Sequence, residues 1–81
     1  SSDVCSSDLE KARIFALFEA QSESLQDVIL DAVEDKVESA VNAPLFIKAI
    51  KDERKKGKIK SLLMKTSTQF MEAMRENGLI D

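Results

Sequence analysis

Apolar side chains recur every three, four or seven positions along the first half of the chain, which is the spacing of one face of an α-helix. This stripe consists of Ile14, Leu17, Phe18, Leu25, Val28, Ile29, Ala32, Val33, Val37, Ala40 and Val41. Because Phe18 and Leu25 lie one heptad apart, the stripe keeps its phase through the polar stretch 21–24. We therefore expect one long helix over about 10–42, roughly 50 Å in length. The alternative is a kink or break at 22–24, where Ser24 and Asp27 have the spacing of a helix cap.

The sequence Asn42-Ala43-Pro44 predicts the end of this helix and the start of another. Proline disfavours helical geometry in the residue before it and is well tolerated in a first helical turn. A second helix is therefore expected over about 44–56. It begins with an apolar segment and continues into a charged one that ends at Gly57. Whether the helix breaks at this glycine stays open, because an isolated glycine costs only about 1 kcal/mol inside a helix.

A last helix is expected over about 58–77. Its apolar stripe consists of Ile59, Leu62, Leu63, Thr66, Phe70, Ala73 and Met74. Asn77-Gly78 predicts its end, because glycine suits the left-handed residue that follows many helices. The chain has no strand-like alternation, so the predicted fold class is all-α, a helical hairpin or small helix bundle. A two-helix hairpin would bury only half of each stripe, so we expect a third helix or a second copy to cover the remainder.

Charge is distributed unequally along the chain. Residues 10–42 carry eight acidic and three basic side chains, whereas residues 43–65 carry eight basic and two acidic ones. We therefore expect the acidic arm of the hairpin to lie against the basic arm, or an oligomer to bring opposite charges together. The longest apolar run, at 14–18, is far shorter than the roughly 20 residues that span a bilayer.

The first nine residues, SSDVCSSDL, resemble the translation of a common short-read sequencing adapter, read as AGT TCA GAC GTG TGC TCT TCC GAT CTN. This resemblance implies that residues 1–9 are not native and must be excluded from fold reasoning. It implies further that the natural start of the protein lies upstream. The length of the remaining segment, residues 10–81, predicts a single small helical domain. The other interpretation is a capping box formed by Ser7 and Glu10. Independent reads of the same gene would decide between the two.

The side chains present do not favour catalysis, so we expect no enzymatic activity and no cofactor. The chain has no histidine or tyrosine, and its one cysteine, Cys5, lies in the adapter-like segment. The acidic residues Asp27, Asp31, Asp35 and Glu38 have helical spacing, but the Glu-x-x-His motif of di-metal helix bundles is missing. We therefore expect a solvated acidic face and no metal site. A cytoplasmic location is the default expectation, because targeting cannot be assessed without the natural start.

Two functions from different classes remain. The first is a small helical protein–protein interaction or assembly module that self-associates through apolar side chains, for which the candidates are Phe18, Leu25, Ile29, Leu63, Phe70 and Met74. The alternative is a small helical nucleic-acid-binding accessory protein that uses the basic segment 48–65. Its candidate contacts follow three-four-three spacing and are Lys48, Lys51, Lys55 and Lys58. Such a row neutralises phosphates, although the simplest interpretation is a face that is solvated or paired within the chain.

Overall fold

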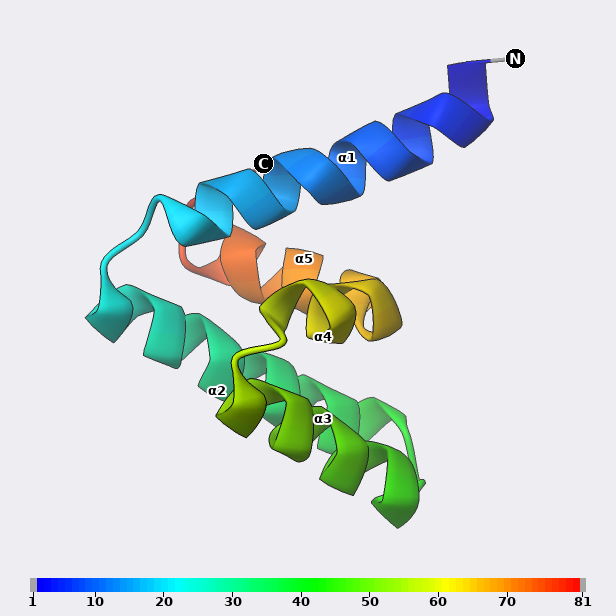
Figure 1. The fold of residues 1–81 in the computed structure, drawn as a ribbon, viewed down its shortest axis with the longest axis vertical. Coiled ribbons are helices and arrows are strands. Elements are labelled where there is room, and N and C mark those ends of the chain that lie inside the picture. The colour runs from blue at the N-terminus through cyan, green and yellow to red at the C-terminus, as the bar shows by residue number, and fades with distance from the viewer. Residues whose placement is uncertain (1, 81) are drawn as a thin grey trace.

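The computed structural model describes residues 2–80, with side chains from Leu9 onward, so Ser1 of the adapter-like segment and Asp81 lie outside the described residues. The described chain forms five helices, which are α1 (Ser2–Glu19), α2 (Glu23–Ala40), α3 (Pro44–Lys56), α4 (Ile59–Lys65) and α5 (Ser67–Glu76) (Figure 1). No strand occurs among residues 2–80, which confirms the all-α fold class.

The first two helices replace the single helix expected over 10–42. The chain leaves the helical path after Glu19 and resumes it at Glu23, so the alternative of a break in this region is the correct one. The capping residue is Ser22 and not Ser24, since the Ser22 hydroxyl accepts a hydrogen bond from the Leu25 amide at 3.4 Å. The Gln26 side chain donates to the Phe18 carbonyl at 3.1 Å. These polar side chains form hydrogen bonds with backbone groups that a helix end leaves without partners. The break in the helix therefore costs little free energy.

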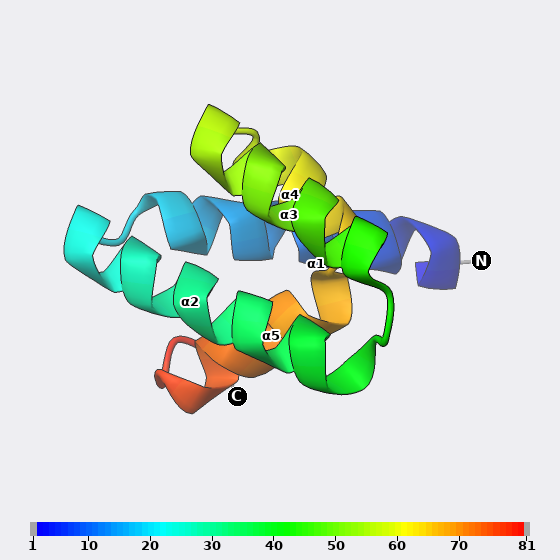
Figure 2. The same ribbon diagram turned by 90° about the horizontal axis from the view of Figure 1, so that it is seen from below.

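The predicted break at Asn42–Pro44 and the helix over 44–56 are both confirmed. Residues 41–43 link α2 to α3, which begins at Pro44 and runs antiparallel to α2 (Figure 2). Gly57 ends α3 in the left-handed conformation, with φ of 78°. This backbone position favours glycine, so the question left open at this residue is answered by a break.

The helix expected over 58–77 is divided at Thr66. Thr66 has φ of −125° and ψ of 41°, outside helical geometry, and its hydroxyl donates to the Leu62 carbonyl at 2.7 Å. The change of direction lets α4 pack against α1 and α3 while α5 packs against α2. The predicted end of this last helix is confirmed, because α5 stops at Glu76 and Gly78 is left-handed with φ of 76°.

The core receives side chains from all five helices. In Figure 1, α4 and α5 lie between α1 and the α2–α3 hairpin. At the centre, the Phe18 ring of α1 meets the Phe70 ring of α5 edge to face, with centroids 5.1 Å apart. The buried apolar side chains are Ile14, Phe18, Ile29, Leu30, Val33, Val37, Ile50, Leu62, Leu63, Phe70, Ala73 and Met74. The helices therefore cover each other's stripes within one chain, forming a small helix bundle.

Candidate interaction surfaces

The residues predicted to mediate self-association lie in the core of the single chain. Five of them are at most 2% exposed, namely Phe18, Ile29, Leu63, Phe70 and Met74. The sixth, Leu25, is half-buried and packs against that core. The expectation arose because a simple hairpin leaves half of each stripe uncovered, whereas the breaks after Glu19 and at Thr66 fold the stripes onto one another. A second copy that contacted the folded chain would therefore touch other side chains.

The acidic face of α2 is partly neutralised by Arg54 of α3. The guanidinium donates to Asp31 at 2.8 Å and to Glu34, and it lies 3.7 Å from Asp27. The hydrogen bond to Glu34, which outweighs the effect of burial, raises the pKa of Arg54 above its ordinary value. Lys51 adds a 3.1 Å ion pair with Glu38. The acidic arm therefore lies against the basic arm, as the charge distribution predicts. Within residues 9–80, whose side chains the structure describes, no group of acidic side chains is arranged to hold a metal ion.

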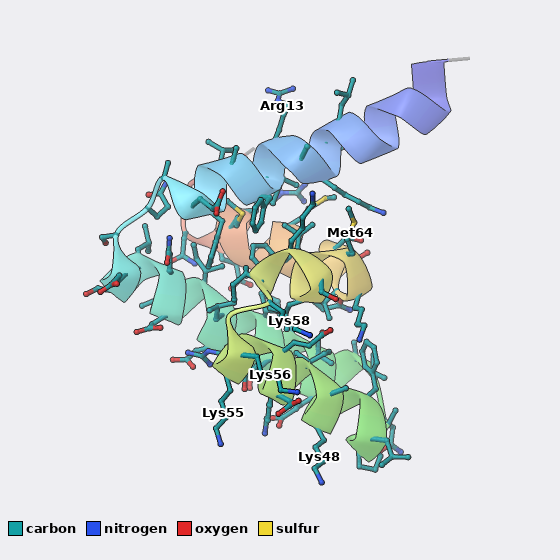
Figure 3. The ribbon with its side chains drawn as sticks, viewed as in Figure 1. Arg13, Lys48, Lys55, Lys56, Lys58 and Met64 are labelled. Atoms are coloured by element: carbon teal, nitrogen blue, oxygen red, sulfur yellow. The ribbon has the colours of Figure 1, made fainter. Side chains whose placement is uncertain are left out.

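The predicted lysine row on α3 is divided by its contacts. Lys48 and Lys55 have no ion-pair partner in the described part of the chain, and Figure 3 shows both pointing away from the bundle. Lys51 is paired with Glu38, so it is not equally available. Lys58 is exposed at the α3–α4 junction and lies close enough to Glu53 to interact electrostatically. Judged from the described residues, the structure thus brings two cations without ion-pair partners to one face of α3, two helical turns apart, where four were expected.

Glu53 joins α3 to α4. Its carboxylate accepts hydrogen bonds from the Ser61 hydroxyl at 2.8 Å and from the Lys65 ammonium at 3.0 Å. The hydrogen bonds from Lys65 and Ser61 lower the pKa of Glu53 below its ordinary value. This contact engages Lys65, which is therefore a structural residue as well as part of the basic segment.

A pocket of about 260 Å³ opens between α1 and α4, and we call it the α1–α4 pocket. Its lining is mostly apolar and consists of Lys11, Ala12 and Phe15 of α1 with Lys60, Leu63 and Met64 of α4. Met64 is 47% exposed and lies on the side of α4 that faces α1 (Figure 3). Neither Lys11 nor Lys60 has an ion-pair partner among the described residues.

The sequence contains only a weak signal for this pocket. Phe15 lies off the main apolar stripe of its helix, which indicates a second apolar face, and Lys60 lies outside the three-four-three lysine row. The pocket forms only because α1 packs against α4. No local pattern predicts which helices pack together. Of the six pocket residues, only Leu63 is therefore among the individual candidates named from the sequence, and it was assigned there to self-association.

A second, larger groove of about 390 Å³ lies between α1, α5 and the segment after α5. Its apolar lining includes Leu17, Met71 and Ile80, and its charged lining combines Glu10 with Arg13 and Arg75. Both signs of charge are therefore present, so the groove selects no particular kind of ligand by charge. It also includes Leu9, the last residue of the adapter-like segment.

Two further observations bear on function. None of the helices in residues 2–80 has the length and apolar content that a membrane-spanning helix requires. Comparison of the chain with models of protein families, with curated proteins and with solved structures gives no match. A function must therefore be inferred from the surfaces described above.

Proposed function

We propose that the chain is a small, non-catalytic helical module that binds another protein through the α1–α4 pocket. The observation that carries this proposal is a mostly apolar hollow, with Met64 half exposed, beside two lysines that lack partners in the described chain. The hydrophobic core forms within one chain. Folding of the chain therefore gives no reason for the apolar surface of the pocket to be exposed. Exposed apolar surface rimmed by polar groups is typical of protein interaction sites.

The size of the pocket favours a protein side chain over a free small molecule. Sites for small molecules and cofactors usually measure about 300–1,000 Å³, and this pocket lies below that range. A bulky apolar side chain inserted into a small pocket is the usual anchor of a protein interface. A partner protein is favoured over a second copy, because the side chains expected to mediate self-association are buried. A cytoplasmic location remains part of the proposal.

Three labelled amphipathic helical peptides test the proposal on the full chain. They share the same central apolar residue and differ in having acidic, neutral or basic neighbours, and their binding is measured by fluorescence anisotropy. We expect at least one dissociation constant below about 1 mM, and weaker binding to Met64→Ala. The control is Val28→Ala, since Val28 on α2 is 50% exposed and lies outside the pocket. Failure of all three peptides to bind, or equal binding to both variants, would contradict the proposal.

Nucleic-acid binding through segment 48–65 is the second candidate function. The projection of Lys48 and Lys55 from α3 supports it (Figure 3). Against it, Lys51, Lys56 and Lys65 each have a carboxylate partner in the chain. Double-stranded DNA at low salt is the probe, and this function requires salt-dependent binding that Lys48→Glu/Lys55→Glu removes. An absence of binding at low salt would eliminate it.

A further inference from the structure

Among the described residues, the charged side chains that line the α1–α4 pocket are all of one sign. Two of its six lining residues are lysines, and within the described chain no acidic side chain lines it. The larger groove beside α5 differs, because it combines Glu10 with two arginines. The α1–α4 pocket therefore favours a partner that brings its own negative charge, since charge complementarity sets the specificity of an interface.

The spacing of the lining residues fits a helical partner. Lys11 and Phe15 lie four residues apart on α1, and Lys60 and Met64 lie four residues apart on α4, so each helix presents one cation and one apolar side chain on a single face. The two helices run in opposite directions (Figure 1), which places the two lysines toward opposite ends of the pocket. A helix bound between them would present an apolar residue at the centre and acidic residues one turn away on each side.

The chain contains an example of this kind of recognition. On α2, Asp27, Asp31 and Glu34 follow helical spacing, and together they surround a cation from the neighbouring helix, Arg54. An acidic helix face thus packs beside a basic helix within the folded chain. No acidic helix face of the described residues lies beside the lysines of the α1–α4 pocket.

From these observations we infer that the α1–α4 pocket binds an acidic amphipathic helix of a partner protein. Its bulky apolar side chain enters between Phe15 and Met64, and its carboxylates pair with Lys11 and Lys60. The inference rests on the proposed function and specifies the chemistry of the partner. A nucleic acid is the less favoured anionic ligand, because the described side chains include no tyrosine or tryptophan for base stacking and Phe15 is half-buried.

The test compares two charge-reversed variants of the full chain, Lys11→Glu/Lys60→Glu and the control Lys48→Glu/Lys55→Glu. Both change the net charge by the same amount, but only the first changes the pocket. For the acidic peptide, we expect the pocket variant to bind about tenfold more weakly or worse, because two attractive pairs become repulsive. The control variant should stay within about threefold of the unmodified chain. Circular dichroism checks folding, and Lys11→Gln/Lys60→Gln replaces the pocket variant if the reversal disturbs α1.

The outcomes separate this inference from the function on which it rests. If the neutral or basic peptide binds at Met64 and the acidic one does not, the module binds proteins but the inferred partner is wrong. If no peptide binds, both fail. Equal weakening by the two charge-reversed variants would also overturn the inference, because it would indicate attraction by overall charge. Displacement of the acidic peptide by DNA from the unmodified chain, with DNA the tighter ligand, would assign the pocket to nucleic acid instead.

Discussion

Two helix pairs in this molecule place basic side chains beside a neighbouring helix, and they differ in what those side chains meet. In the α2–α3 pair, Arg54 and Lys51 contact carboxylates of α2. In the α1–α4 pair, Lys11 and Lys60 border an apolar pocket and have no ion-pair partner in the described chain. The same type of side chain is therefore structural in one pair and, in our proposal, binds a partner in the other.

The largest loss of stability should come from removing the ring of Phe70 on α5, which lies between α1 and the α2–α3 hairpin. Phe70 is fully buried against Phe18, so Phe70→Ala should lower the free energy of unfolding by about 3–5 kcal/mol. Small domains have roughly 0.05–0.15 kcal/mol of stability per residue, so this variant should lose much of its stability. Urea denaturation followed by circular dichroism measures the change. Leu45→Ala is the control, because Leu45 is 84% exposed. A loss below 1 kcal/mol in Phe70→Ala would contradict the proposed core.

The next largest loss of stability should come from removing Arg54, the cation that contacts three carboxylates in the α2–α3 pair. Arg54→Ala leaves Asp27, Asp31 and Glu34 close together without their shared partner, and should cost about 1–2 kcal/mol. The expected loss of unfolding free energy is modest, because the side chains of Asp27 and Asp31 are 73% exposed and water screens their charges. Added salt should reduce the difference from the unmodified chain. Lys55→Ala, one residue along and without an ion pair, should change stability by less than about 0.5 kcal/mol. Equal losses in the two variants would show that Arg54 has no special role.

A smaller effect should appear at the turn between α1 and α2. Because Ser22 caps α2, Ser22→Ala should cost about 1 kcal/mol of unfolding free energy. Ser24→Ala serves as the matched control, since Ser24 lies inside α2 and should change stability by less than about 0.5 kcal/mol. The same urea titration measures both. A larger loss at Ser24 would place the cap, and the break, at the other serine.

The smallest effect depends on pH. The folded state lowers the pKa of Glu53, so this group stabilises the fold above its unfolded pKa of about 4.3, and that contribution is lost as pH falls through the folded pKa. Thermal unfolding should therefore show Glu53→Gln less stable than the unmodified chain at pH 7, by less than about 1 kcal/mol because Lys65 is exposed. Near pH 2 the two should converge. A difference that persists unchanged at low pH would indicate a packing effect instead.

Local chemistry made part of the fold predictable from sequence. Pro44 and Gly78 act within a turn of their own position, and the helix boundaries expected near them are confirmed. The break at Thr66 was missed because threonine is no helix breaker in itself. It results from the packing of α4 and α5 against different helices. The break after Glu19 was only an alternative, because the apolar stripe keeps its phase across it.

Prediction of the candidate sites depends on tertiary structure even more than prediction of the helix boundaries does. The sequence identified most residues of the apolar stripes correctly as buried surface, although Leu17 and Val28 are exposed. It did not show whether one chain or two would bury these stripes. The row of four lysines is visible in the sequence, whereas the ion pair that engages Lys51 requires the α2–α3 contact. The two halves of the α1–α4 pocket are more than 40 residues apart in the chain. A single sequence predicts which face a helix buries more readily than which helix covers it.

The measurement that tests the central claim most directly is a ¹H–¹⁵N NMR titration of the full chain with the acidic amphipathic peptide. We expect the largest amide shifts at the residues that line the α1–α4 pocket, which are Lys11, Ala12, Phe15, Lys60, Leu63 and Met64. The α2–α3 hairpin should shift little, because none of its residues lines the pocket and its cations Lys51 and Arg54 already have partners. Largest shifts around Lys48 and Lys55, or around Met71 and Ile80, would contradict the account.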